Sequence, residues 1–109
     1  MMQSLEEIKR NIARGQILRI TRIAMNYEQS EMAALMETSK SYFSLLENAK
    51  RSINDNVLNK YLKYFSIDRQ VFEKVESEVI EILFREEVEM IRVAFLVVGM
   101  LRTKNKCVA

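Results

Sequence analysis

The sequence predicts an all-α fold. The chain of 109 residues has no Pro and only two Gly, whereas β folds built from hairpins need many turn glycines. Apolar residues make up 49% of the chain, which is enough for a buried core. They recur at intervals of three and four residues, as on one face of a helix. We therefore expect the apolar faces of several helices to enclose one core.

The first helix is expected to begin at the N-terminus of the chain. Ser4 and Glu7 have the spacing of a capping box, and apolar residues follow at helical intervals. Gly15 predicts a break or a bend, so the first helix is assigned to residues 4–14. A second apolar run carries the pattern to Asn26, a residue suited to the left-handed conformation that ends helices.

The next segment predicts two short helices around a tight turn. The residues of their inner faces are Met32, Ala33, Met36, Phe43 and Leu46. Ala33 is important because two helices that cross steeply need a small side chain at their contact. The outer face of the second helix carries Lys40, Ser41, Ser44 and Leu45, groups that suit contact with base edges and phosphates.

The remaining elements follow from caps and apolar stripes. Asn54 or Asp55 can cap a fourth helix, whose stripe ends at Phe65. A long amphipathic helix is expected from Arg69 to near Glu89. The following run is almost wholly apolar and predicts a buried or intersubunit helix, although residues 93–98 also suit a strand.

Composition excludes several classes of function. The chain has no His and a single Cys, Cys107, which rules out a Ser/His/Asp triad, a Cys/His dyad and a zinc site. We expect no catalytic residues, no metal and no cofactor. One Cys fits a reducing cytosol, the N-terminus lacks the apolar core of a signal peptide, and no run reaches the ~20 apolar residues of a membrane span. A cytoplasmic protein with no membrane partner is therefore expected.

Net charge is +2 but is unevenly distributed. Residues 1–66 carry ten Lys/Arg and seven Asp/Glu, whereas residues 67–109 carry seven and eight. The first part is thus modestly basic, which permits DNA binding without requiring it.

Residues 15–67 resemble the phage-repressor-like helix-turn-helix family, the XRE or Cro/cI type. The matching residues are Gln29, Glu31-Met32-Ala33, Ser39, Ser41-Tyr42-Phe43-Ser44, Leu46-Glu47, Lys50-Arg51, and Arg19 and Arg22 in the first helix. Leu58, Leu62 and Phe65 match the fourth helix of the family. The sequence departs from the family at Glu37 and Ala49, where Gly is usual, and at Thr38, where Val is usual.

The resemblance implies a five-helix lambda-repressor-like DNA-binding domain, assigned to residues 1–67. Residues 68–109 lie outside the resemblance and are assigned to a C-terminal helical extension for dimerisation. The resemblance also implies that Arg22 and Glu47 form an ion pair that ties the first helix to the third. The residues expected to contact DNA are Gln29, Ser39, Lys40, Ser41, Tyr42, Ser44, Leu45, Lys50 and Arg51.

These side chains have different expected roles. Gln29, Lys50 and Arg51 suit phosphates, Lys40 and Ser41 suit base edges, and Leu45 suits a thymine methyl group. Gln29 is also expected to brace the recognition helix. Exposed side chains with no ligand are the ordinary alternative for each of them. For Tyr42, partial burial beside the fourth helix is an equally good interpretation.

The predicted function is sequence-specific DNA binding by a transcriptional repressor of bacterial or phage origin, located at the nucleoid. The excess of apolar residues between 79 and 101 predicts a homodimer held by residues 68–101, which suits a two-fold symmetric operator. One alternative is a DNA-binding antitoxin or restriction-system controller, whose C-terminal part would cover a toxin. Another is a protein-interaction module with a degenerate helix-turn-helix, to which Glu37 and the low net charge point.

Overall fold

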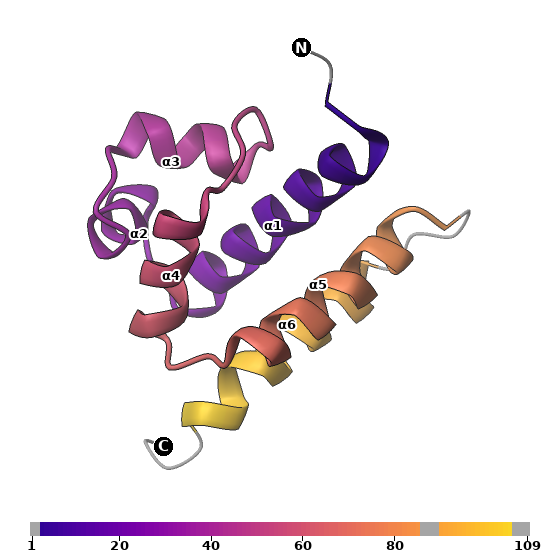
Figure 1. Ribbon diagram of the computed structural model, residues 1–109. Helices are drawn as coiled ribbons and strands as arrows, with labels where there is room; N and C mark the ends of the chain where they lie inside the picture. The colour runs from indigo at the N-terminus through magenta and orange to yellow at the C-terminus, as the bar shows by residue number, and fades with distance from the viewer. Residues whose placement is uncertain (1–2, 86–89, 106–109) are drawn as a thin grey trace.

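The computed structural model describes residues 3–85 and 90–105. These residues form six α-helices and no strand, so the fold is all-α. The helices are α1 (Leu5–Ala24), α2 (Gln29–Leu35), α3 (Lys40–Glu47), α4 (Asp55–Tyr64), α5 (Arg69–Leu83) and α6 (Met90–Asn105). The long helix α1 lies in the middle, with α2, α3 and α4 on one side and the antiparallel pair α5 and α6 on the other (Figure 1).

Helix α1 is continuous through Gly15. The Ser4 hydroxyl caps its start by accepting the Glu7 N–H at 3.1 Å, as predicted. The helix runs to Ala24, so the break at Gly15 and the limits 4–14 are wrong. Gly15 is instead a close-packing residue, because a Cβ there would lie 2.7 Å from the backbone oxygen of Glu47. Its missing side chain lets α1 and the end of α3 meet backbone to backbone.

Each of the first four helices ends in the same backbone motif. The residue after the C-cap has a left-handed backbone conformation, and its N–H donates to the carbonyl of the residue three positions earlier. The N–H of the next residue donates to the carbonyl of the residue five positions before that next residue. At the end of α2, Glu37 donates to Ala34 at 3.1 Å and Thr38 donates to Ala33 at 2.9 Å. The four left-handed residues are Asn26, Glu37, Ala49 and Ser66, with φ between 54° and 60°. The left-handed ending predicted at Asn26 is thus confirmed, and none of the four is Gly.

Helix α5 is shorter than predicted. It ends at Leu83, with Phe84 as C-cap, and not near Glu89. Glu86, Glu87 and Glu89 follow in the sequence. In a longer α5 these carboxylates would lie at the helix C-terminus, where negative charge is unfavourable. Residues 86–89 lie outside the described residues, as does Cys107.

Helix α6 includes residues 93–98, so the alternative of a strand is wrong. Val93, Val97, Met100 and Leu101 are buried, with the three- and four-residue spacing of one helix face. This face packs against α1 and α5. Burial on one side of a helix explains why β-favouring residues such as valine nevertheless form α structure here, since tertiary packing outweighs local preference.

The helices enclose one continuous core. The expected boundary between residues 67 and 68 falls between α4 and α5. Four helices precede it and not the expected five, because α1 is continuous through Gly15. Side chains from both segments belong to the same cluster of buried residues. Tyr61 lies at its centre, where its hydroxyl and that of Thr21 are 2.9 Å apart and burial raises the pKa of Tyr61.

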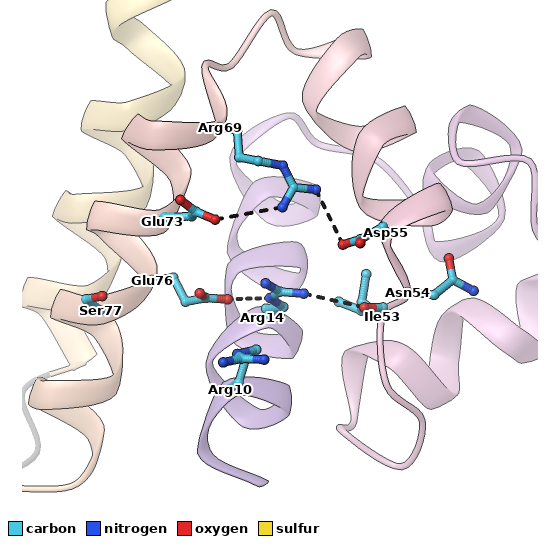
Figure 2. A pocket seen from close by; sticks show the side chains of 9 residues that line it. All are labelled: Arg10, Arg14, Ile53, Asn54, Asp55, Arg69, Glu73, Glu76 and Ser77. Carbon is cyan, nitrogen blue, oxygen red and sulfur yellow. Dashed lines mark hydrogen bonds and ion pairs between the residues drawn. The ribbon is translucent and has the colours of Figure 1, made fainter. Parts of the chain in front are cut away.

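A buried ion pair joins the two sides of the core. Arg14 of α1 binds Glu76 of α5, and both side chains are nearly buried (Figure 2). The guanidinium of Arg14 also lies over the ring of Phe72, 5.8 Å from its centroid. Separating the two groups would leave a charge in the protein interior without a partner, which is energetically unfavourable. The ion pair therefore fixes α5 against α1.

The left-handed residues give a stability prediction. Ala49→Gly should stabilise the protein by about 0.5–1 kcal/mol, because an L-residue with a side chain pays ~1 kcal/mol or more in this conformation. Part of that gain is lost to the greater freedom of Gly in the unfolded chain. Chemical denaturation measures the change.

The matched control is Ala34→Gly, at an exposed position inside α2. The same exchange should destabilise there by about 0.5–1 kcal/mol. Equal losses of stability in the two variants would show that Ala49 is not left-handed in solution.

Candidate nucleic-acid interface

Helix α3 presents a polar face to solvent because its apolar face is fully buried. Phe43 and Leu46 point into the core and are inaccessible to solvent. Lys40 and Ser41 lie on the opposite side and are exposed. Ser39 begins the helix, since its hydroxyl accepts the N–H of Tyr42 at 3.0 Å. The short helix therefore has a defined start and a defined outer surface.

The turn between α2 and α3 is held from several sides. Ala33 is buried, as the sequence predicts. The Thr38 hydroxyl donates to the Ala33 carbonyl at 3.4 Å. Glu37 forms an ion pair with Lys60 of α4 at 3.4 Å. The two residues that depart from the family pattern at this turn thus make contacts that hold it in place.

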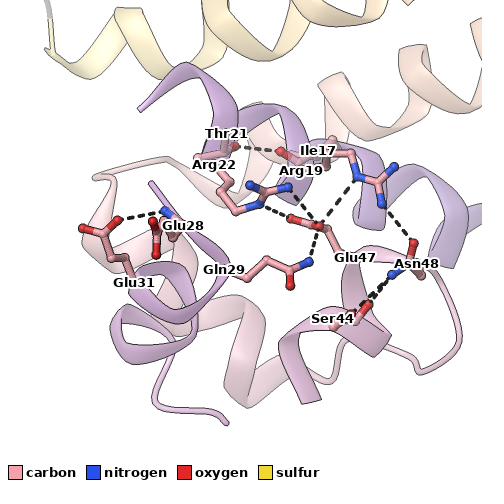
Figure 3. Close-up of polar contacts among 10 residues, drawn as sticks. All are labelled: Ile17, Arg19, Thr21, Arg22, Glu28, Gln29, Glu31, Ser44, Glu47 and Asn48. Atoms are coloured by element: carbon pink, nitrogen blue, oxygen red, sulfur yellow. Dashed lines mark hydrogen bonds and ion pairs between the residues drawn. The ribbon is translucent and has the colours of Figure 1, made fainter. Parts of the chain in front are cut away.

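The carboxylate of Glu47 is the most strongly constrained polar group of this region. Its side chain is inaccessible to solvent. Arg22 of α1 donates to it twice, from Nε at 2.6 Å and from Nη2 at 3.3 Å, and Gln29 of α2 donates at 2.9 Å (Figure 3). Arg19 lies 3.6 Å away. The ion pair that the resemblance implies between Arg22 and Glu47 is therefore present, within a larger cluster that joins α1, α2 and α3.

This cluster also suits the end of α3. The C-terminus of a helix carries partial negative charge, which the two arginines of α1 offset. Arg19 donates to the side chain of Asn48, the C-cap of α3, at 2.9 Å. Asn48 in turn donates to the Ser44 carbonyl at 2.8 Å. The contact between Arg19 and Asn48 was not predicted, because an Asn after a helix is equally compatible with an ordinary exposed loop.

Gln29 has a structural contact in addition to its expected contact with DNA. One N–H of its side-chain amide is used by Glu47. A primary amide has two N–H groups, so a second one is left for another acceptor. Gln29 lines a shallow pocket of about 450 Å³ together with Lys40, Ser41 and Ser44. The structure thus brings four of the nine predicted DNA-contacting residues to one place.

The other predicted residues differ in their exposure to solvent. Leu45 is partly exposed, whereas the ring of Tyr42 packs against the core, in keeping with the interpretation of partial burial. Lys50 and Arg51 follow α3 and are exposed. Ser39 uses its hydroxyl oxygen as a cap, although its O–H can still donate.

Comparison of the chain with protein-family models, with curated proteins and with solved structures gives no match. Among the helices of residues 3–85 and 90–105, none combines the length and the apolar character that crossing a membrane requires.

Removing one member of the Glu47 cluster should be costly. Arg22→Met leaves a buried carboxylate with only Gln29 and the more distant Arg19, so we expect a loss of about 3 kcal/mol, the low end for a broken buried pair. The free energy of unfolding in urea measures it. In a double variant, Arg22→Met with Glu47→Gln, part of this stability should return because no charge is left unpaired.

Arg85→Met provides the control. Its ion pair with Glu81 joins two exposed side chains of the α5 region, so its loss should change stability by less than about 0.5 kcal/mol. If Arg22→Met is as mild as this control, Glu47 does not depend on Arg22.

Proposed function

We propose that the protein is a sequence-specific DNA-binding transcriptional regulator that inserts α3 into the major groove. The observation that carries this proposal is the polar surface that Gln29 forms with Lys40, Ser41 and Ser44 of α3. The buried Glu47 cluster fixes the position of this helix. An α-helix with its side chains is ~10–12 Å in diameter, and the major groove is ~12 Å wide. The resemblance to phage-repressor-like proteins supports the same docking.

The side chains around α3 divide into two chemical groups. Lys40 and Ser41, at the exposed start of the helix, can reach the hydrogen-bonding edges of bases. Leu45, one turn further, can contact a thymine methyl group. Lys50 and Arg51, after the helix, suit the phosphate backbone. Recognition and general affinity would then depend on different residues of the same surface.

Glu37 does not prevent this function. It adopts the left-handed conformation that the tight turn needs, with φ of 55°, and its carboxylate is paired with Lys60. Its negative charge is thereby partly offset where the turn would approach DNA. Glu37, which favoured the alternative of a degenerate helix-turn-helix, is thus compatible with DNA binding.

We further propose that the protein acts as a dimer through the outer face of α6. Phe95 is 74% exposed, and Gly99, one turn further, is also exposed. An exposed Phe beside a Gly suits close packing of a second helix. A second copy of α6 would give a two-fold interface, and a dimer can place two α3 helices about one DNA turn apart. Occupancy of such an operator at a promoter suffices for repression.

The two groups of side chains give a DNA-binding prediction. Lys50→Ala and Arg51→Ala should each weaken binding to all sequences. Each should also lower the number of counterions released on binding by about one, which reduces the slope of log affinity against log salt concentration. Lys40→Ala and Leu45→Ala should change which sequence is preferred, by about 1–3 kcal/mol at the affected base pair. Binding-site selection and titrations at several salt concentrations measure these effects.

Lys74→Ala is the matched control, since Lys74 is exposed on α5, on the other side of α1 from α3 (Figure 1). It should leave both affinity and salt dependence unchanged. Unaltered specificity in both the Lys40 and Leu45 variants would refute the assignment of α3 as the recognition helix.

The dimer is tested by Phe95→Glu. A charge at the centre of an apolar interface should give a monomer of 12.8 kDa in sedimentation, whereas the wild type should sediment at twice this mass at micromolar concentration. Ile23→Glu, which places the same charge at another exposed apolar position, should remain dimeric. A monomeric wild type, or a dimeric Phe95→Glu variant, would contradict the interface.

A further inference from the structure

A polar cavity of about 510 Å³, wide open to solvent, lies on the side of α1 that faces α5 and the start of α4 (Figure 2). Its charged lining consists of Arg10, Arg14, Asp55, Arg69, Glu73 and Glu76. The cavity contains no residue of the proposed DNA-contacting surface. Its size lies within the range of small-molecule sites, ~300–1,000 Å³.

Two of the three arginines in this cavity are engaged by carboxylates. Arg14 binds the nearly buried Glu76. Arg69 lies between Asp55, at 3.5 Å, and Glu73, at 3.8 Å. These pairs account for all three carboxylates of the lining.

Arg10 is the remaining cation. It lies one turn before Arg14 on α1, and its side chain extends into the cavity in Figure 2. Throughout residues 3–85 and 90–105, it has no ion pair and no side-chain hydrogen bond. A second pocket of about 240 Å³, which reaches Asn11 and Ser52, adjoins the cavity at Arg10. Arg10 is exposed to solvent, and Glu7 also lines the second pocket. An arginine placed between two pockets offers a planar set of donors suited to a carboxylate or a phosphate.

We propose that this cavity binds a small anion, a metabolite bearing a phosphate or carboxylate group, with Arg10 as its main ligand. The Ser77 hydroxyl, also part of the lining, offers a neutral donor on the opposite wall. Glu73 is about half exposed and can accept from a hydroxyl or amino group of the same ligand. The charged lining is balanced overall, so such a ligand is selected by local geometry and not by a strong positive field.

The cavity is connected to the proposed DNA-contacting surface through residues 52–55. Arg14 donates to the Ile53 carbonyl at 3.4 Å, Asn11 donates to the Ser52 hydroxyl at 3.1 Å, and Arg69 binds Asp55. This segment directly follows Lys50 and Arg51. An anion that draws Arg14 or Arg69 away from these contacts loosens the segment, which displaces the phosphate-contacting residues. The anion therefore lowers DNA affinity, an effect that rests on the proposed function.

Binding is tested without DNA, with inorganic phosphate as the probe. Phosphate replaces chloride at constant ionic strength while the backbone amide resonances of the protein are followed by NMR. We expect saturable shifts at Arg14, Ser52 and Ser77, with the affinity at least fivefold lower in Arg10→Gln. Lys9→Gln is the matched control, since the Lys9 ammonium lies over the Phe84 ring, and it should bind as the wild type does. Shifts that do not saturate, or that are unchanged in Arg10→Gln, overturn the site.

Regulation is tested by DNA affinity at saturating phosphate and at matched chloride. We expect phosphate to weaken DNA binding at least threefold more in the wild type than in Arg10→Gln. Equal weakening in both proteins would mean that phosphate competes at the DNA surface, and it overturns the regulatory role. If the protein binds no DNA, the proposed function and the regulatory role both fail, while the NMR titration still decides the anion site.

Discussion

The geometry of the proposed DNA-binding surface depends on one buried carboxylate. Glu47 ends α3 and is inaccessible to solvent, so its charge must be matched inside the protein. Moving such a group out of water costs several kcal/mol unless hydrogen bonds and an opposite charge compensate. The compensating groups come from two other helices: Arg22 from α1 and Gln29 from α2. Any shift of α3 along or across these helices would break at least one of the contacts.

Close backbone packing reinforces the same arrangement. Gly15 allows the last turn of α3 to touch α1, and a methyl group at that position would collide with backbone atoms that cannot move aside. The left-handed residues then reverse the chain within two or three positions, so that α2 and α3 remain short and close together. A charge cluster, a glycine contact and tight helix ends therefore place α3 at the surface with its polar side outward.

The sequence predicted those features that depend on local spacing. The cap at Ser4, the left-handed residue at Asn26, the small residue at Ala33 and the buried inner face of α3 all follow from residue type and helical period. The all-α fold follows from the same periodicity.

Features that depend on distant contacts were not predictable in this way. Gly15 has the sequence context of a helix breaker, and only its proximity to Glu47 gives it a packing role. Gln29 was expected to brace the recognition helix, but its acceptor there, Glu47, could not be identified from the sequence. The polar cavity beside Arg10 combines residues from α1, α4 and α5, so no single motif could indicate it.

The proposed function requires a dimer that presents two fixed α3 helices to DNA. Selection from a library of randomised duplexes, with sequencing of the bound fraction, measures whether it does. We expect enrichment of a two-fold symmetric sequence whose half-site centres are about 34 Å, or one helical turn, apart. Failure to enrich any sequence over repeated rounds would contradict sequence-specific binding, and enrichment of a single asymmetric half-site would contradict the paired arrangement.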